Sequence, residues 1–235
     1  MKIVTWNCNG AFRKKFEELK VFDADIYVIQ ECENPSLSKH SAYQDWAKNY
    51  LWIGDTKNKG LAVFAKEGVQ LEKLGWPSQY QDFNLKHFLA CRINDEFNLI
   101  AVWAHQNVDS NFPYIGQLWL YIQLNSDFLK DSFVVGDFNS NFIWDKKNRA
   151  WNHSNVVAEL KELGMKSVYH EQFQEEQGSE SIPSFYLQRN QEKPYHIDYI
   201  FGPNKYVEKT AFLKIGSPEE WLSLSDHMPI LCEFH

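Results

Sequence analysis

Polar and acidic side chains follow several of the strand-like apolar runs in this sequence, at the point where each run ends. The ends of strands are where a sheet presents chemical groups to a cleft. Because an uncompensated buried carboxylate costs several kcal/mol of folding free energy, carboxylates gathered near a core need a cation, hydrogen bonds or protons. The side chains concerned are Asn7, Glu31, His105, Asp137, Asn139, Asp198, Asp226 and His227.

A divalent cation is the simplest compensation for these carboxylates. The set is rich in oxygen donors and contains no cysteine, which suits a hard ion. Mg²⁺ keeps several waters and takes one or two carboxylates together with a substrate phosphate, and Mn²⁺ can substitute for it. The sequence therefore predicts a magnesium site that presents its cation to a phosphate ester.

Each motif also has a simpler interpretation when it is taken alone. A strand that ends in Glu31 is often only a transition to a surface loop, and Asp137-Phe138-Asn139 is typical of a turn whose Asp and Asn bond their own backbone. His105 is then an ordinary interior histidine, and Ser225-Asp226-His227 is a loop before the last strand. The joint occurrence of the motifs favours one shared site over these separate interpretations.

Short apolar runs recur along the chain and predict the strands that carry these side chains. Several runs are continuous and do not alternate with polar residues, as expected of strands buried on both faces. The expected strands are 3–6, 26–29, 61–64, 88–93, 99–103, 133–135, 184–187, 197–201 and 230–234.

Three apolar stripes with helical spacing predict helices between the strands. They lie at 12–19, 115–129 and 156–163. Ser154 or Asn155 is the expected N-cap of the third helix, and Gly164 its end. Many strands, few helices and no regular alternation indicate an α+β fold in which helices cover the faces of layered sheets. No linker is evident, so 1–235 is expected to form a single domain, with a mobile acidic loop at 171–180.

The balance of charge limits how this protein can hold a polyanion. The chain has 235 residues and a formal net charge of −7, so it lacks the broad positive field that drives nonspecific binding to nucleic acid. Two basic clusters can bind phosphates locally and stack a base, or they are ordinary solvated faces. They are Arg13-Lys14-Lys15, and Lys146, Lys147 and Arg149 between Trp144 and Trp151.

The cysteines and the N-terminus suggest a location for the protein. Cys8, Cys32, Cys91 and Cys232 are scattered in or beside strand-like runs, with neither metal nor disulfide spacing. The N-terminus opens with strand-like residues and not with a signal peptide, and no apolar run approaches the length of a membrane span. A cytoplasmic location without membrane association is therefore expected. The sequence gives no basis for inferring an obligate protein partner.

Six motifs in order resemble those of the endonuclease/exonuclease/phosphatase superfamily, which includes exonuclease III-like enzymes, apurinic/apyrimidinic endonucleases and pancreatic-type deoxyribonucleases. The resemblance spans nearly the whole chain. It implies a four-layer α/β/β/α sandwich, with two packed mixed sheets, helices on the outer faces and the site at one end of the sheets. The motifs are Trp6-Asn7-Cys8-Asn9-Gly10, Gln30-Glu31, the strand ending at His105, Gly136-Asp137-Phe138-Asn139, His196-Ile197-Asp198-Tyr199-Ile200 and Ser225-Asp226-His227.

The resemblance also implies roles for the residues that handle the metal and the water. Glu31 would be the central metal ligand, with Asn9 and Asp226 contributing to the metal shell. Asp137 would orient or deprotonate the attacking water, and Asn139 would position that water or the phosphate. A carboxylate in the role of Asp137 contributes about 10²–10⁴-fold to the rate as a general base.

Further roles that the resemblance implies surround the phosphate. Asn7 would lie close to the metal, and His105 would lie near the scissile phosphate. His227, paired with Asp198 or Asp226, would donate a hydrogen bond to a nonbridging oxygen or act in proton transfer. Such preorganised donors stabilise the charge that develops on the phosphoryl oxygens.

Departures from the family pattern bear on the substrate. His105 stands where the apurinic/apyrimidinic enzymes usually have tyrosine, and Glu31 is followed by Cys32-Glu33 instead of threonine and lysine. Asp198 is followed by Tyr199, whereas the inositol polyphosphate phosphatases have arginine there. A nuclease resembles this chain more than an inositol phosphatase does, although a repair activity at abasic sites is less favoured.

Three functions follow from these observations. The leading one is Mg²⁺-dependent hydrolysis of phosphodiester bonds in nucleic acid, of endonuclease or exonuclease type, by in-line attack of water. The alternative is a phosphatase or phosphodiesterase for a small-molecule or lipid phosphate ester, which the acidic surface favours. The third is a catalytically inert binding module.

Overall fold

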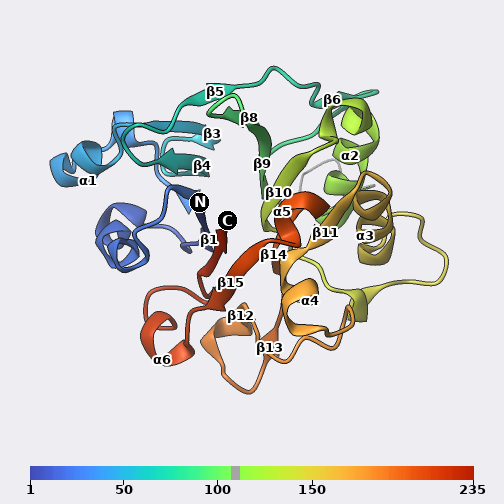
Figure 1. Ribbon diagram of the computed structural model, residues 1–235. Coiled ribbons are helices and arrows are strands. Elements are labelled where there is room, and N and C mark those ends of the chain that lie inside the picture. Colours follow the sequence, from blue (N-terminus) through green and yellow to red (C-terminus); the bar gives the residue numbers. More distant parts are fainter. Residues whose placement is uncertain (107–111) are drawn as a thin grey trace.

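A computed structural model gives the structure of the protein and describes residues 1–106 and 112–235. Two mixed six-stranded sheets face each other, and helices cover their outer faces (Figure 1). The first sheet has the order β15-β16-β1-β2-β4-β3 and the second the order β11-β14-β10-β9-β8-β5. The predicted four-layer α/β/β/α sandwich is confirmed.

The strands of the first sheet are β1 Lys2–Asn7, β2 Ile26–Cys32, β3 Tyr50–Thr56, β4 Lys59–Ala65, β15 Thr210–Ile215 and β16 Ile230–Phe234. Those of the second sheet are β5 Leu71–Lys73, β8 Phe88–Ile93, β9 Phe97–Trp103, β10 Ser132–Asp137, β11 Met165–Ser167 and β14 Asp198–Pro203. Two short hairpins pair β6 Gln79–Tyr80 with β7 Phe83–Asn84, and β12 Phe185–Tyr186 with β13 Pro194–Tyr195.

The helices are α1 Ser41–Trp46, α2 Ile115–Leu129, α3 His153–Glu162, α4 Val168–Phe173, α5 Asn204–Val207 and α6 Pro218–Trp221. The 3-10 segments of the described residues are η1 Phe12–Lys14, η2 Phe16–Phe22, η3 Pro35–Leu37, η4 Phe142–Trp144 and η5 Leu187–Arg189. In Figure 1, α1 lies outside the first sheet, and α2 and α3 lie together outside the second.

Apolar clusters fill the spaces between these layers. The central cluster lies between the sheets and contains Val28 of β2 and Val135 of β10. Their neighbours Ile29 and Val134 point the other way, into the outer clusters beneath α1 and beneath α2 and α3. Because both faces of these strands are buried, Ile26–Ile29 of β2 and Phe133–Val135 of β10 are uninterrupted apolar runs, as the sequence shows.

Strand pairing brings the polar ends of the central strands to neighbouring positions. β1 runs parallel to β2, with Asn7 opposite Gln30, and β10 runs antiparallel to β14, with Asp137 opposite Asp198. Gly136 precedes Asp137 at φ 142°, and an added Cβ there would lie 2.0 Å from the backbone oxygen of Val102. Only glycine therefore lets β10 approach β9 closely enough to place Asp137 at the strand end.

Some expected elements differ from the structure for identifiable reasons. The stripe at 12–19 forms the two 3-10 segments η1 and η2 and not an α-helix, because Lys15 leaves the helical region at φ −127° and its Nζ donates to the Cys8 oxygen over 2.6 Å. The expected strand 184–187 shortens to β12, because the Ser184 hydroxyl accepts hydrogen bonds from two backbone N–H groups of the facing segment and Leu187 begins η5.

The predicted cap of α3 was wrong, and its predicted end was right. Asn152 is the N-cap, and Asn155 lies three residues later, where its Oδ1 accepts a hydrogen bond from the Asn152 backbone N–H over 3.0 Å. Gly164 follows the helix at φ 81°, a left-handed conformation that ends helices.

The predicted loop at 171–180 is present from residue 174 onward, because α4 ends at Phe173. Its mobility stays a prediction. The segment begins in α4, and the carboxylate of Glu180 accepts hydrogen bonds from Asn141 Nδ2 at 3.0 Å and from the Gly178 backbone N–H at 3.1 Å. It also pairs with His170 Nε2 at 3.1 Å. Glu180 thus connects this acidic segment to Asn141 and to His170 of α4.

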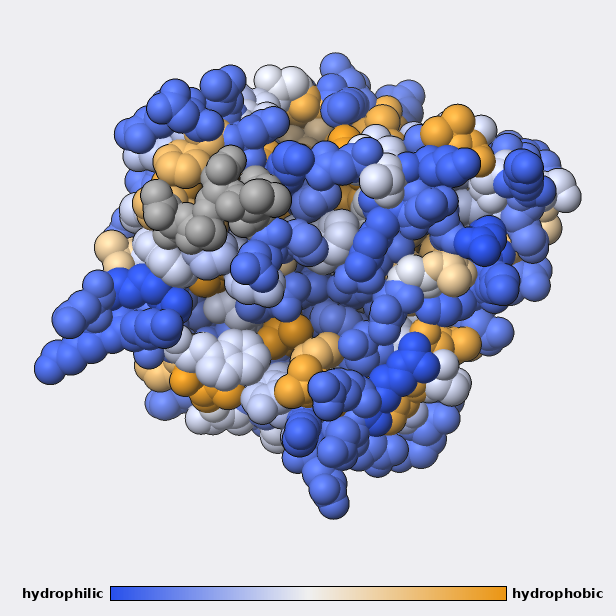
Figure 2. All heavy atoms as spheres, turned by 180° about the vertical axis from the view of Figure 1, so that it is seen from behind, coloured by the Kyte–Doolittle hydropathy of each residue, from blue (hydrophilic) through white to orange (hydrophobic). Residues whose placement is uncertain are grey.

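The surface of the protein is mainly polar. Seen from behind, the molecule is mainly hydrophilic, with apolar atoms in small separate patches (Figure 2). Among residues 1–106 and 112–235, no helix has the length and apolar character needed to cross a membrane. All four cysteines are free and buried.

Candidate active site

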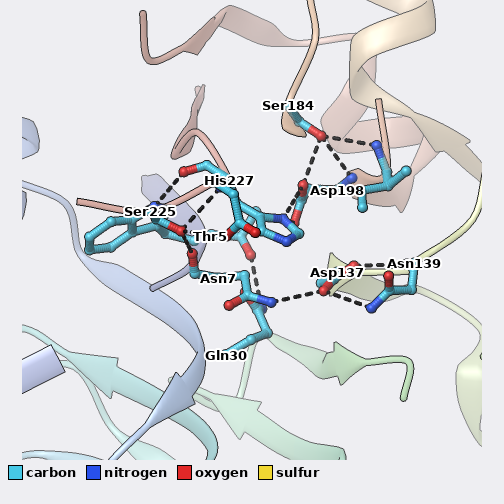
Figure 3. A network of polar contacts seen from close by, with 12 residues as sticks. Thr5, Asn7, Gln30, Asp137, Asn139, Ser184, Asp198, Ser225 and His227 are labelled. Carbon is cyan, nitrogen blue, oxygen red and sulfur yellow. Dashed lines mark hydrogen bonds and ion pairs between the residues drawn. The ribbon is translucent and has the colours of Figure 1, made fainter. Parts of the chain in front are cut away.

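Asp137 belongs to a polar network at the ends of the sheets (Figure 3). Its side chain is fully buried. Asp137 Oδ2 accepts hydrogen bonds from Asn7 Nδ2 at 3.0 Å and Asn139 Nδ2 at 3.1 Å, and Oδ1 accepts one from the Asn139 backbone N–H at 2.8 Å. The hydrogen bond expected of a turn, from the Asn139 backbone N–H to Asp137, is therefore present. The carboxylate is also bound by Asn7 of the other sheet, so the turn is part of a larger site.

Asp198 and His227 form a buried pair beside Asp137. His227 Nδ1 lies 2.9 Å from Asp198 Oδ2, which also accepts a hydrogen bond from Ser184 Oγ at 2.7 Å. Ser225 Oγ accepts from the His227 backbone N–H at 3.1 Å and donates to the Asn7 backbone oxygen at 2.7 Å. His227 is thus held through both its ring and its backbone N–H (Figure 3). The carboxylate that pairs with its ring is Asp198, one of the two that the sequence left open, Asp198 and Asp226.

The ionisation of this cluster differs from that of free side chains. Burial raises the pKa of Asp137 to about 7, with a smaller raising contribution from Asp198 and an opposing one from His227. Burial alone would lower the pKa of His227, but the carboxylates of Asp198 and Asp137 raise it to about 10. At neutral pH His227 is therefore a cation, while Asp137 gains and loses a proton near neutrality, the range suited to a general base.

The same three side chains lie close enough together to be considered as a metal site. One ligand atom from each of Asp137, Asp198 and His227 lies within 4.8 Å of the others, and this is the one such group in the described part of the chain. The raised pKa of Asp137 shows that its negative charge is incompletely compensated. Because His227 is a cation at neutral pH, only the two carboxylates of this cluster could serve a divalent cation as ligands.

Glu31 lies at the same edge but outside this group of three. It follows Gln30, the partner of Asn7 in the β1–β2 ladder, and has a left-handed φ of 64°. Its Oε2 lies 2.9 Å from Lys59 Nζ. The carboxylate thus already holds a cationic group, which is consistent with the predicted role of binding a positive ion.

Asn9 and Asp226, the other expected metal ligands, contact each other. Asn9 Nδ2 donates to Asp226 Oδ1 at 2.9 Å in an exposed position, and the Asn9 backbone N–H donates to Asn7 Oδ1 at 3.0 Å. Asp226 therefore joins the N-terminal motif and not the His227 imidazole. Its role as a metal ligand stays a prediction.

His105 is exposed at the end of β9. Its ring packs edge-on against Trp103, with 4.9 Å between ring centroids, and lies 5.7 Å from the ring of His87. It is therefore not an ordinary buried histidine. The exposed ring is free to face a ligand, as expected of a residue near a scissile phosphate.

The two arginines among the side chains predicted to bind substrate have partners of their own. The guanidinium of Arg13 pairs with the buried carboxylate of Glu33. That of Arg149 lies 4.4 Å from the Trp151 ring centroid and donates from Nε to Asn152 Oδ1 at 2.7 Å. These contacts shape the local backbone, so a role in substrate binding is not their only explanation.

Trp144 and the two lysines that follow it are more available. Trp144 is 42% exposed in η4, and its ring lies 5.1 Å from that of Tyr195. Lys146 and Lys147 are exposed. Together they form an aromatic and basic strip that begins five residues after Asn139.

Two residues of the site, Ser184 and Lys59, were not predicted from the sequence. Ser184 was expected only to begin a strand, yet its hydroxyl holds Asp198; Lys59 was not considered, yet it contacts Glu31. Neither has a spacing signal, because a serine or lysine at the edge of a strand is common and its partner lies many residues away.

Comparison with known proteins tests the predicted family. The Endonuclease/Exonuclease/phosphatase family matches residues 4–227, which is nearly the whole chain. The chain belongs to this family. A search of curated proteins returned no match.

Solved structures support the fold of this endonuclease/exonuclease/phosphatase chain. It is similar to a 3′ phosphatase, NExo, from Neisseria, bound to product DNA hairpin, with 20% identity, a TM-score of 0.70 and coverage of 100% of this chain and 99% of that one. An AP endonuclease from Archaeoglobus fulgidus has 19% identity, a TM-score of 0.73 and the same coverage. The APE2 catalytic domain of Xenopus laevis has 17% identity, a TM-score of 0.70 and coverage of 100% and 91%.

Proposed function

We propose that this protein hydrolyses phosphodiester bonds in nucleic acid with the help of Mg²⁺. The observation that carries the proposal is the buried cluster of Asp137, Asp198 and His227, in which one ligand atom from each lies within 4.8 Å of the others. A phosphodiester is an anion that repels hydroxide, so a site for its hydrolysis needs a general base together with cationic or hydrogen-bonding groups. This cluster contains both kinds of group.

Oxygen ligands for the metal are available beside the cluster. Glu31, which already pairs with an ammonium group, would be the central ligand, with Asp226 and the amide oxygen of Asn9 contributing. Such a donor set suits Mg²⁺, and Mn²⁺ as its substitute. When bound, the ion would supply Lewis-acid stabilisation of the phosphoryl oxygens.

The remaining chemistry falls to side chains of this chain. Asp137, with a pKa of about 7, takes the proton of the attacking water, and Asn7 and Asn139 hold its carboxylate in one orientation. His227 is held through Nδ1 by Asp198, so its Nε2 is the nitrogen left to donate to a phosphoryl oxygen. Water attacks in line with the ester bond that breaks, and no covalent intermediate forms.

Nucleic acid is the favoured substrate for two reasons. The related AP endonucleases and the DNA-bound 3′ phosphatase act on DNA according to their names. In this chain, exposed Trp144 and the neighbouring Lys146 and Lys147 provide a ring for stacking and charges for a backbone. The 3′ phosphatase relative and the net charge of −7 favour a phosphomonoesterase as the second candidate.

A substrate panel tests the proposal. Purified protein is incubated with single-stranded DNA, duplex DNA, duplex DNA with an abasic site, RNA, a 3′-phosphorylated oligonucleotide and small phosphate esters, each with Mg²⁺ or with EDTA. We expect cleavage of at least one nucleic acid in Mg²⁺ and none in EDTA. Release of phosphate from monoesters alone would support the second candidate. If no substrate gives a metal-dependent product, the inert binding module is the interpretation that remains.

Trp144 gives a prediction about substrate binding. Replacing Trp144 by alanine is expected to raise KM for a single-stranded oligonucleotide about 5- to 100-fold with little change in kcat, because stacking contributes about 1–3 kcal/mol per base. Phe128→Ala is the control, since Phe128 is 51% exposed at the far end of α2. Steady-state kinetics with both variants check this, and an equal effect of the two would remove Trp144 from the binding surface.

A further inference from the structure

Lys59 brings an additional positive charge to the edge of the proposed site. Its Nζ lies 2.9 Å from Glu31 Oε2, and the two side chains are 49% and 16% exposed. The same Nζ lies 5.5 Å from the ring centroid of Trp103, the ring against which His105 packs. Lys59 therefore contacts the carboxylate proposed to hold the metal and shares an aromatic ring with the histidine proposed to lie near the phosphate.

A β-bulge turns Glu31 toward this lysine. In the β2–β4 ladder Gln30 pairs with Leu61 and Cys32 pairs with Gly60, so Glu31 is left between them without a partner. Its left-handed backbone is typical of a bulge that re-aims one side chain. The residue next to Gly60 on β4 is Lys59, which is why the two charged groups meet.

Trp52 holds the β3–β4 hairpin against the bulge. Its Nε1 donates to the Cys32 backbone oxygen at 3.2 Å. Its ring occupies the space beside Gly60, where an added Cβ would lie only 2.4 Å from a ring carbon. The position of Lys59 is thus fixed by a partly buried aromatic contact and a glycine, and not only by its ion pair.

We propose that Lys59 binds a phosphate of the substrate and exchanges between two partners. In the free protein it neutralises Glu31, and when a divalent cation takes Glu31 the ammonium moves to a phosphate oxygen. The inference rests on the proposed function. An ammonium group and a divalent ion on one carboxylate repel each other, and the flexible, half-exposed lysine stem lets the charge move to a nearby anion.

Metal binding tests the first half of the exchange. Lys59→Met keeps most of the apolar stem and removes the charge, and we expect Mn²⁺ to bind about 3- to 10-fold more tightly than to wild type, because the competing cation is gone. Electron paramagnetic resonance of free Mn²⁺ during a titration measures this. If the ion pair only holds Glu31 in place, Lys59→Met should instead bind Mn²⁺ more weakly. Unchanged or weaker Mn²⁺ binding therefore overturns the proposal.

Substrate binding tests the second half. The Asp137→Asn background suppresses cleavage, and the affinity for a labelled short oligothymidylate in Mn²⁺ is measured by fluorescence anisotropy. Adding Lys59→Met is expected to weaken binding about 10- to 100-fold, and adding Lys59→Arg to change it less than about threefold, because the charge and donors remain. Equal affinities with methionine and lysine at this position overturn the proposal.

Lys66, just beyond the other end of β4, provides a matched control. It is 52% exposed and pairs with Asp23 at 3.0 Å. Lys66→Met is expected to change neither Mn²⁺ nor oligonucleotide binding. If wild type cleaves nothing in the substrate panel, the proposed function fails, while the Mn²⁺ titration still decides the competition at Glu31. If wild type is active and Lys59→Met matches it in both assays, only the inference about Lys59 fails.

Discussion

Replacing Asp137 by asparagine is expected to lower kcat for phosphodiester hydrolysis by about 10²–10⁴-fold, the usual contribution of a general base. Asparagine has nearly the same shape but accepts no proton from water. The same substitution is expected to raise the stability of the metal-free protein at alkaline pH. Loss of activity with gain of stability is a signature that ordinary disruption of a site does not produce.

The stability effect follows from the direction of the pKa shift. Burial raises the pKa of Asp137 from 3.8 to about 7 in the folded protein, so folding disfavours its charged form. The penalty is absent below pH 3.8, grows between the two values and is complete above about pH 7. It amounts to at most about 4 kcal/mol at about 1.4 kcal/mol per pKa unit. Contacts that asparagine makes less well with Asn7 and Asn139 reduce the gain.

Thermal unfolding in EDTA checks this expectation. Asp137→Asn should raise Tm relative to wild type at about pH 8 and leave it unchanged or lower at about pH 4. Asp131→Asn is the control, because Asp131 precedes the other end of β10 and pairs with Lys205 at the surface. It should alter neither kcat nor Tm noticeably. A variant of Asp137 that keeps more than a tenth of wild-type kcat would contradict the role of this carboxylate.

Much of the sandwich was predictable because its strands are buried on both faces. The runs Phe88–Ile93 and Ile230–Phe234 coincide with β8 and β16. Each contains one charged residue, Arg92 or Glu233, but its apolar residues end where the chain leaves the core, so the ends of the strand are visible in sequence. Strands with mixed burial, such as Tyr50–Thr56 and Thr210–Ile215, were not expected, because their exposed residues interrupt the apolar pattern.

The members of the site were predictable, but several of their partners were not. Asn7, Asp137 and Asp198 stand out because a polar residue directly adjoins a buried strand. Which carboxylate pairs with His227 depends on where β14 and the last loop meet, and sequence spacing carries no information on that. The contact between Lys59 and Glu31 depends likewise on a bulge and on the fit of Trp52 against Gly60.

The buried pair of His227 and Asp198 leads to the second large effect. His227→Asn is expected to lower kcat by about 10²–10³-fold, the usual loss when one preorganised donor to a developing oxyanion is removed. It also leaves the buried Asp198 carboxylate without its cation. Breaking such a pair commonly costs about 3–5 kcal/mol of stability.

The pH dependence of this loss distinguishes the ion pair from simple packing. The pKa of His227 is raised from 6.5 to about 10 in the folded protein, so the pair stabilises the fold fully below pH 6.5 and loses its contribution as pH rises through about 10. The difference in unfolding free energy between wild type and His227→Asn should therefore shrink across this range. Denaturant titrations at several pH values measure it, and a constant difference would indicate packing alone.

A second buried histidine–carboxylate pair in the same chain provides the control. His170 Nε2 lies 3.1 Å from Glu180 Oε1, with exposures of 12% and 3% against 7% and 2% for His227 and Asp198. His170→Asn should lower stability as well, yet leave kcat within a few-fold of wild type. In a double-mutant cycle, His227→Asn and Asp198→Asn should be strongly non-additive in kcat, because each disables the same donor. Additive losses would mean that Asp198 acts on the substrate or metal directly and not through the imidazole.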